Sequence, residues 1–181
     1  MRAPDKPSGG GVFSLRLLLP SDAPQYREFR LNNLRLYPTF FRADAREEAL
    51  KPLSTSERRL TPTPLNRWLG AFDMGGILVG AVGIRREPGA KRQHIGQVIG
   101  LGVDQAWQGK GVATALMLDV IDYARSLDGL QQLQLTVTVP NPAAEQLYDR
   151  LGFKVFGLER DALRIGGNTY PKQHRQLFIE R

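Results

Sequence analysis

A glycine-rich segment in the middle of the chain has the residue types and the spacing to bind an anion. Residues 108–114 read Gln-Gly-Lys-Gly-Val-Ala-Thr and lie between an apolar run and a segment with helical periodicity. The first N–H groups of a helix have no partners within it and carry partial positive charge, and glycine lets the main chain approach a ligand closely. The segment therefore predicts a site for phosphate oxygens, with a plain tight turn as the alternative.

Two common phosphate-binding motifs do not match this segment. A P-loop requires Ser or Thr directly after its lysine, but Gly111 follows Lys110. The dinucleotide fingerprint would need glycine or alanine at the position of Gln105 or of Thr114, depending on the glycine at which it starts. The sequence therefore excludes both motifs here.

Hydrophobic periodicity and turn residues predict the elements that position the segment. The predicted strands span residues 13–19, 68–72, 77–84, 97–103, 133–139, 153–158 and 165–178. The predicted helices span residues 22–37, 43–60 (as one or two short helices), 112–127 and 141–151, with Ser21-Asp22 and Asn141 as N-caps. The unit from Gln97 to Val139 is the one parallel crossover in this order. The pattern predicts a single α/β domain with a mixed sheet.

The composition excludes several classes of protein. A length of 181 residues fits one domain over residues 12–181, after a leader over residues 1–11 that we expect to be flexible. The lack of cysteine excludes disulfides and a thiol nucleophile, and two histidines argue against a multi-imidazole zinc site, so we expect no metal. Because no apolar run reaches the roughly 18 residues of a membrane span, we expect no membrane partner and a cytoplasmic location.

The net charge of +7 favours an anionic partner, such as a phosphorylated cofactor or nucleic acid. A basic cluster flanks the hairpin predicted near residue 89, and we interpret it as solvated charge rather than as a site for an acidic substrate or nucleic acid. Its members are Arg85, Arg86, Lys91 and Arg92. Nucleic acid ranks below a cofactor because the cluster lacks the aromatic residues on which single strands stack.

Two motifs resemble those of the GNAT superfamily of N-acetyltransferases. Gln108-x-x-Gly111-x-Ala113 is similar to the Arg/Gln-x-x-Gly-x-Gly/Ala pattern of that family. The stretch from Asn141 to Phe153 is similar to its Asn-x-x-Ala-x-x-Leu-Tyr-x-x-x-Gly-Phe signature. The resemblance extends from Leu15 to about Phe178. It implies a mostly antiparallel central sheet with one splayed parallel pair, flanked by helices, and direct acetyl transfer from acetyl-CoA to a primary amine in a ternary complex.

The resemblance also implies a set of cofactor contacts. In this family the glycine-rich turn holds the pyrophosphate of acetyl-CoA, and the preceding strand lends main-chain groups to the pantetheine arm. Gly100 and Gly102, inside an apolar strand, independently indicate a bulge there. The residues so implied are Leu101, Gly102, Val103, Gln108, Gly109, Lys110, Gly111, Val112, Ala113, Thr114, Asn141 and Tyr148. Lys110 either adds charge to this site or faces water.

By the same resemblance, Tyr148 is the catalytic general acid. A phenol with a pKa of about 10 is protonated at neutral pH and can donate its proton to the leaving thiolate. Tyr148 also lies in an apolar stripe with Ala144, Leu147 and Leu151, so filling the core is the alternative. Asn141, two helical turns earlier, is sufficiently explained as a helix cap.

The general base is missing from the expected place. Many relatives carry a glutamate near the start of the fourth strand, where this chain has Gln97. A water chain, Glu47, Glu48 or His94 could substitute, or the amine could arrive deprotonated. Gln97 also motivates a second hypothesis, in which the chain is a catalytically weak acyl-CoA-binding sensor or a basic interaction module on the same fold.

The sequence does not determine which amine is the acceptor. Tyr170 and His174 fall near the C-terminal strand, where relatives shape the acceptor pocket, and Lys172 stands at a position that is often acidic in similar sequences. The acceptor is therefore an amine of an unidentified small molecule, peptide or protein. Relatives often dimerise, so a homodimer is compatible with the resemblance, and the sequence leaves the oligomeric state open.

Overall fold

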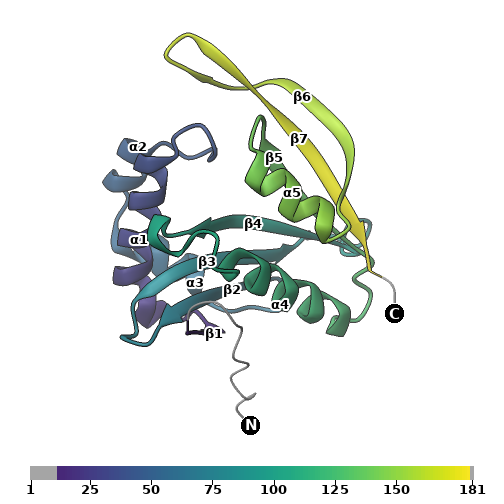
Figure 1. The fold of residues 1–181 in the computed structure, drawn as a ribbon. Helices are drawn as coiled ribbons and strands as arrows, with labels where there is room; N and C mark the ends of the chain where they lie inside the picture. Colours follow the sequence, from purple (N-terminus) through teal and green to yellow (C-terminus); the bar gives the residue numbers. More distant parts are fainter. Residues whose placement is uncertain (1–11, 180–181) are drawn as a thin grey trace.

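The computed structural model describes residues 12–179, so the leader expected over residues 1–11 lies outside the described residues. These residues form one sheet with helices on both faces (Figure 1). In chain order the elements are β1 (Phe13–Leu17), α1 (Ala23–Leu36), α2 (Ala45–Leu50), α3 (Leu53–Leu60), β2 (Asn66–Asp73), β3 (Leu78–Arg86), β4 (Ile95–Val103), α4 (Val112–Ser126), β5 (Gln132–Thr138), α5 (Pro142–Arg150), β6 (Lys154–Ile165) and β7 (Asn168–Phe178). Short 3₁₀ helices at Pro20–Asp22 and Gln105–Trp107 precede α1 and α4.

The sheet has one parallel strand pair among the described residues. The strand order is β1-β2-β3-β4-β5-β7-β6, and every neighbouring pair is antiparallel except β4 and β5. The parallel pair is short, because Ile95–Gln97 pairs with Gln132–Gln134 and no pairing follows it. Beyond this point β5, β6 and β7 turn away from β4 (Figure 1). The predicted splayed pair is confirmed.

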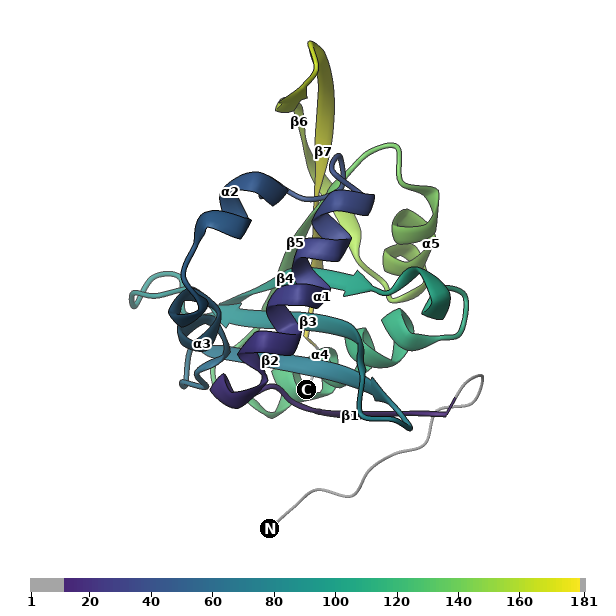
Figure 2. The same cartoon turned by 90° about the vertical axis from the view of Figure 1, so that its left-hand side faces the viewer.

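Two hydrophobic clusters hold the helices on opposite faces of the sheet. The larger one joins α4 and α5 to the strands through Leu116, Val120 and Leu147 among others. The smaller one joins α1 and α3 to β2 and β3, with Tyr26 packed edge-on against Trp68 at a centroid distance of 5.4 Å. Figure 2 shows α1, α2 and α3 in front of the sheet, and α4 and α5 beside and behind it. The helices therefore leave the splayed end of β4 and β5 between the two layers.

The start of α5 follows from its local sequence. The Asn141 side chain accepts a hydrogen bond from the Ala144 N–H at 3.3 Å, and Glu145 reaches back to the Asn141 N–H at 2.8 Å. Pro142 occupies the first helical position, where its missing N–H costs nothing. This reciprocal cap confirms the predicted role of Asn141 as a helix cap.

Most element boundaries differ by a few residues from the sequence predictions, and two differences have a clear physical cause. Asp22 occupies the N-cap position of α1, but its carboxylate pairs with Arg16 at 2.8 Å and accepts the Leu19 N–H at 2.9 Å instead of capping the helix. The strand predicted over residues 153–158 continues as β6 to Ile165, because β7 pairs with Glu159 and, beyond a register shift, with Leu163, Arg164 and Ile165. Hydrophobic alternation is weak over residues 159–164, so cross-strand pairing, not pattern, extends this strand.

Candidate active site

A bulge interrupts β4 just before the glycine-rich turn. Ala81 pairs with Gly102 and Gly83 with Ile99, so β4 holds one more residue than β3 between these pairs. Gly100 has a φ of +63°, and a Cβ at this position would lie 2.7 Å from the ring of Trp68. Only glycine fits here without strain. The bulge indicated by the strand glycines is confirmed.

The glycine-rich turn opens α4 with exposed main chain. Gly109 and Gly111 have φ values of +73° and +83°, and nothing lies within 4 Å of the place where a Cβ of Gly109 would stand. The first hydrogen bond of α4 joins the Ala115 N–H to the Gly111 carbonyl at 2.9 Å. The N–H groups of residues 112–114 therefore have no partners within the helix. The turn presents donors and open space together, as an anion requires.

Lys110 does not simply extend into water. Its ammonium lies 5.0 Å from the ring centroid of Trp107, over the face of the indole. This cation–π contact keeps the charge beside the turn. Asp104 supports the same region because its carboxylate accepts the Ala106 N–H at 2.9 Å. Sequence reasoning did not single out either Trp107 or Asp104.

Gln108 connects the turn to the loop between α1 and α2. Its Nε2 donates to the Tyr37 hydroxyl at 2.9 Å, and Tyr37 stacks on Phe40 with 5.6 Å between ring centroids. The hydroxyl of Thr138, at the end of β5, donates to the Phe40 carbonyl at 3.5 Å. The α1–α2 loop thus spans from the glycine-rich turn to the end of β5. Sequence reasoning missed Tyr37, since nothing in its local pattern indicates a partner 71 residues away.

Tyr148 lies on α5, and its side chain is buried in the larger hydrophobic cluster. Its ring packs edge-on against Phe153 with 5.9 Å between centroids. Burial raises the pKa of Tyr148 to about 12, and the positive charge of Arg175 opposes this shift. The phenol is therefore protonated at neutral pH. Its packing fits the core-filling role as well, so burial alone does not separate the two roles.

Arg175 on β7 fixes α5 against the sheet. Its side chain is 3% exposed and donates to Asp149 Oδ1 at 2.6 Å. It also donates twice to Gln173 Oε1, at 3.0 and 2.8 Å, and to the Glu145 carbonyl at 3.4 Å. These contacts hold α5, the helix that carries Tyr148, against β7. Sequence reasoning missed Arg175 because two of its partners, Glu145 and Asp149, lie on another element.

The structure narrows the choice of general base. Gln97 Nε2 donates to Gln134 Oε1 at 3.1 Å, at the last paired residues before β4 and β5 separate. Neither amide can take up a proton. Glu48 is buried and bonded to Arg30, Lys51 and Arg59 at 2.6, 2.7 and 2.8 Å, and these partners lower its pKa to about 2 against the effect of burial. Glu48 is therefore a poor base at neutral pH.

Glu47 and His94 are the remaining candidates for the general base. Glu47 is exposed on α2. The His94 carbonyl accepts the N–H groups of Gln131 and Gln132 at 2.8 and 3.1 Å, at the paired end of β4. The bulge of β4 at Gly100 lies roughly 20 Å further along the strand at the usual rise per residue. His94 is therefore a residue of the β3–β4 connection.

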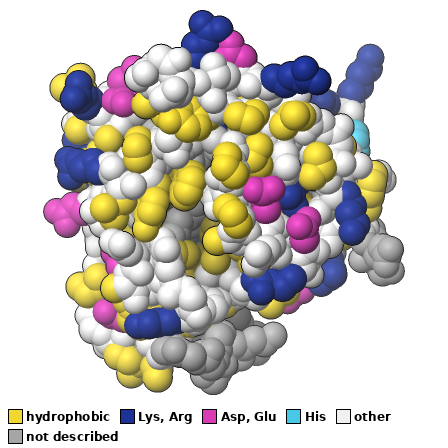
Figure 3. Space-filling view, turned by 45° about the horizontal axis from the view of Figure 1, so that its top comes forward, with side chains coloured by type: hydrophobic (Ala, Val, Ile, Leu, Met, Phe, Trp, Pro, Cys, Tyr) yellow, Lys and Arg dark blue, Asp and Glu magenta, His cyan; other side chains and the backbone are white. Residues whose placement is uncertain are grey.

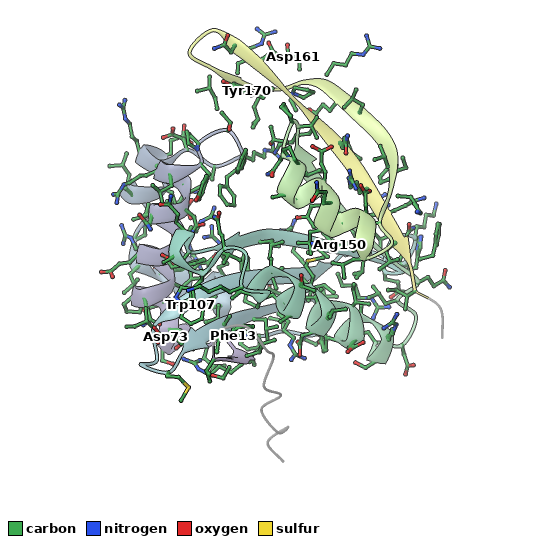
Figure 4. All side chains as sticks on the ribbon, in the orientation of Figure 1. Phe13, Asp73, Trp107, Arg150, Asp161 and Tyr170 are labelled. Carbon is green, nitrogen blue, oxygen red and sulfur yellow. The ribbon has the colours of Figure 1, made fainter. Side chains whose placement is uncertain are left out.

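The acceptor-side residues lie on the arm formed by β6 and β7. Figure 4 shows Tyr170 on this arm, where it projects beyond the rest of the sheet, while Trp107 lies in the segment that joins β4 to α4. His174 pairs with Glu159 at 3.5 Å and packs against Phe156 with 5.9 Å between ring centroids. Lys172 is only 8% exposed. Hydrophobic side chains surround a hollow on the face that looks down onto the splayed end (Figure 3).

The basic cluster near the β3–β4 connection has structural contacts. Arg86 donates to the Gln93 carbonyl and, at 2.9 Å, to the Asp128 carbonyl after α4. Arg92 lies 3.8 Å from Glu87. Arg86 therefore joins two connections rather than standing as solvated charge, which corrects that part of the interpretation.

Residues 12–179 contain neither a grouped set of metal-binding side chains nor a helix suited to a membrane span. No group of three or more His, Cys, Asp or Glu side chains is placed to share an ion there. Over the same range, no helix has both the length and the apolar character for a bilayer crossing.

Comparison with known proteins places the chain in a family. Residues 31–153 match the model of the acetyltransferase (GNAT) family. The chain is 38% identical over 105 residues to N-alpha-acetyltransferase RimI from Mycobacterium tuberculosis, covering 58% of this chain and 63% of RimI. It is 34% identical over 111 residues to the L-amino acid N-acetyltransferase AaaT from Escherichia coli, covering 61% of this chain and 67% of AaaT. The match thus spans about two thirds or less of each relative's length.

The structural comparison covers more of the chain. The fold superposes on a GNAT-family acetyltransferase from Streptococcus pneumoniae with a TM-score of 0.83 and 26% identity, over 92% of this chain and 99% of that one. The family motifs predicted from sequence lie on the elements described above, and the predicted fold class is confirmed. The chain therefore belongs to the acetyltransferase (GNAT) family.

Proposed function

We propose that this protein is an N-acetyltransferase that moves an acetyl group from acetyl-CoA to a primary amine by direct attack in a ternary complex. The observation that carries the proposal is the arrangement of β4. Its ladder with β5 ends at Gln97, its main chain bulges at Gly100, and the glycine-rich turn follows directly. An unpaired strand edge that leads into a set of free N–H groups suits a long ligand with a pyrophosphate at one end.

The residues of this region would divide the binding of acetyl-CoA between them. The main chain of Leu101, Gly102 and Val103 would pair with the pantetheine arm, as an added strand does. The pyrophosphate would meet the turn, through Gln108, Gly109, Lys110, Gly111, Val112, Ala113 and Thr114. Since the Asn141 side chain is already used as a cap, its contact with the cofactor would come second to that role.

Tyr148 would act as the general acid. Its phenol stays protonated at neutral pH and could donate to the sulfur of the leaving thiolate. The thioester supplies the acetyl group, and a main-chain N–H of β4 would polarise its carbonyl. Gln97 and Gln134 offer no base, so we propose that the amine loses its proton to water or arrives uncharged.

Free-CoA release tests this function directly. The full chain would be incubated with acetyl-CoA and a panel of amino acids, peptides, basic proteins and small amines. A thiol reagent reports the released CoA without a signal from protein thiols, because the protein has no cysteine, and a reaction without acceptor measures hydrolysis. We expect release that depends on an acceptor, and a higher Tm with acetyl-CoA alone. The names of RimI and AaaT make α-amino groups of peptides and free amino acids the first acceptors to test.

The amide pair of Gln97 and Gln134 favours a second candidate, a protein that binds acyl-CoA as a sensor or interaction module without efficient turnover. A rise in Tm with acetyl-CoA but no acceptor-dependent release across the panel would support this candidate over the enzyme. No effect of acetyl-CoA on Tm would contradict both.

A further inference from the structure

A lysine is buried on the acceptor side of the sheet without a carboxylate partner. Lys172 on β7 is 8% exposed, and within residues 12–179 its ammonium forms no ion pair. The cross-strand neighbour that could neutralise it, Glu159, lies 3.5 Å from His174 Nε2 instead and has a side chain that is 54% exposed. The ammonium of Lys172 is not among the fully buried polar atoms without a hydrogen-bond partner, so the stem of the side chain is buried while its charged end stays accessible to a ligand.

A second cation acts on Lys172. Arg42, in the α1–α2 loop, interacts electrostatically with Lys172. Burial and Arg42 lower the pKa of Lys172, and Glu159 opposes this shift. Two cations held together repel each other, and an anion that entered between them would remove both the repulsion and the cost of burial.

The register places Lys172 on the substrate side. Lys172 lies opposite Thr138 in the β5–β7 pair, and directly opposite residues in such a pair share a face. Leu133, Leu135 and Val137 of β5 face the main core, so Thr138 and Lys172 face the other way. This is the side covered by the α1–α2 loop, because the Thr138 hydroxyl donates to the Phe40 carbonyl.

The same loop links this position to the cofactor turn. Tyr37, at its start, bonds to Gln108, and Phe40 contacts Thr138. The splayed end of β4 and β5 lies between these two contacts. A molecule whose amine reaches the acetyl group in this gap would therefore have its remaining groups near Lys172 and Arg42.

We propose that Lys172 and Arg42 bind a carboxylate of the acceptor, which makes the substrate class an amine that carries a carboxylate close to the amino group. This inference rests on the proposed function, because it deepens the same site. A carboxylate is an anion that can accept hydrogen bonds from both an ammonium and a guanidinium. It has two sources in this class: the α-carboxylate of a free amino acid, or the side chain of an acidic residue near a peptide N-terminus.

Matched acceptors distinguish these sources. The first pair is L-leucine and L-leucinamide, and the second is Ala-Asp-Ala-amide and Ala-Asn-Ala-amide. We expect the wild-type protein to prefer the carboxylate in one pair, and that pair identifies the source. The preference should be visible in kcat/KM even though the amine of leucinamide is the more readily deprotonated one. Equal kcat/KM within both pairs would overturn the inference.

Three variants assign the preference to the two cations. Lys172→Met keeps the length of the side chain, Arg42→Gln removes the second charge, and Lys91→Met removes a charge from the exposed β3–β4 connection as a control. Loss of a hydrogen-bonded ion pair should raise KM for the carboxylate acceptor about 10- to 100-fold in Lys172→Met, and less in Arg42→Gln. The neutral acceptor and the Lys91→Met protein should show no such change. A structural role for Lys172 would instead affect both acceptors equally.

A binding measurement separates this inference from the proposed function. The acetylated forms of the same four compounds cannot react, so calorimetry with the CoA-saturated protein reports binding alone. If no acceptor turns over but an acetylated carboxylate binds to wild type and not to Lys172→Met, the inference stands and the proposed activity fails. If acceptors turn over without dependence on Lys172, the activity stands and the inference fails.

Discussion

At the residue scale, the environment of Tyr148 suits both its packing role and the general-acid role that we propose. The same burial that packs its ring against Phe153 also keeps its phenol protonated, by raising its pKa to about 12. A general acid that must donate to a thiolate needs this state at neutral pH. Because the acid form persists far above neutrality, titration of Tyr148 should not limit the rate in the ordinary working range.

Tyr148→Phe tests the assignment. The variant keeps the ring and removes the hydroxyl, so we expect kcat to fall about 10²-fold or more while the Kd for acetyl-CoA and the Tm stay nearly unchanged. Steady-state kinetics and calorimetry measure the two quantities. Tyr123→Phe, which removes a hydroxyl on α4 beside Arg67, is the matched control. An unchanged kcat in Tyr148→Phe would remove this residue from the mechanism.

Glu48 was a candidate general base by residue type, but its environment makes it unsuitable for this role. Its carboxylate accepts from Arg30 and Arg59 at Oε1 and from Lys51 at Oε2. A carboxylate that binds three cations is stabilised in its charged form and holds a proton weakly. A glutamate can transfer protons, but the three cations around Glu48 give it a structural role as the centre of an ion-pair network.

At the scale of elements, this carboxylate joins three helices. Glu48 on α2 is the centre of the network. Its partners are Arg30 on α1, Lys51 directly after α2 and Arg59 on α3. Glu48 is the only buried residue of α2, and α2 contributes no side chain to either hydrophobic cluster, so the ion-pair network has a large share in the placement of this helix. The α1–α2 loop, with Tyr37 and Arg42, depends on that placement.

Glu48→Gln should therefore loosen the helical layer. Removing the charge leaves partly buried cations without a counter-ion, which costs about 3–5 kcal/mol in comparable buried networks. Urea unfolding at pH 7 measures this as a lower free energy of unfolding. Glu47→Gln, at the neighbouring exposed position on α2, should change it little. Equal effects of the two substitutions would contradict the assignment.

The bulge of β4 is a second feature at this scale. Ala at position 100 would have both an unfavourable positive φ and a Cβ 2.7 Å from the Trp68 ring. Gly100→Ala should destabilise the protein by about 2–5 kcal/mol and weaken binding of acetyl-CoA. Gly89→Ala is the control, because φ is +89° there but nothing lies within 4 Å. Backbone strain alone should cost it about 1–2 kcal/mol and leave cofactor binding intact. Equal cofactor binding in the two variants would show that the bulge does not position the ligand.

For the whole molecule, the ion-pair network makes stability depend on acid. The pKa of Glu48 is about 2 in the folded protein, below its ordinary value of 4.5, so the unfolded chain binds more protons between these values. The stability that this shift contributes is complete above pH 4.5 and is lost as the pH falls toward 2. Urea unfolding across this range should show the decline in wild type and a shallower one in Glu48→Gln. Parallel declines would place the acid sensitivity elsewhere.

The splayed sheet suits the two substrates that we propose for this protein. Strands β4 and β5 share three paired residues on each side and then diverge, which leaves main-chain groups of β4 for one ligand and a gap for the other. The α1–α2 loop and the β6–β7 arm border the gap from opposite sides. The residues that we assign to the acceptor come from these two segments, and the residues assigned to acetyl-CoA come from β4 and the turn.

The sequence by itself determined the parts whose cause is local. The glycine-rich turn and the cap of α5 by Asn141 depend on neighbours within a few residues, so their patterns predict them. The long helix α4 and the alternating strand β5 follow from periodicity for the same reason.

Only the tertiary structure decided which polar residues meet. Gln108 and Tyr37 are 71 residues apart, Arg30 and Glu48 are 18 apart, and Arg175 and Asp149 are 26 apart. No local pattern carries such pairings, because they arise when separate elements pack against the sheet. Glu48 as a structural centre and Lys172 as a buried cation are therefore visible only in the folded chain, where burial and neighbouring charge set the chemistry of each side chain.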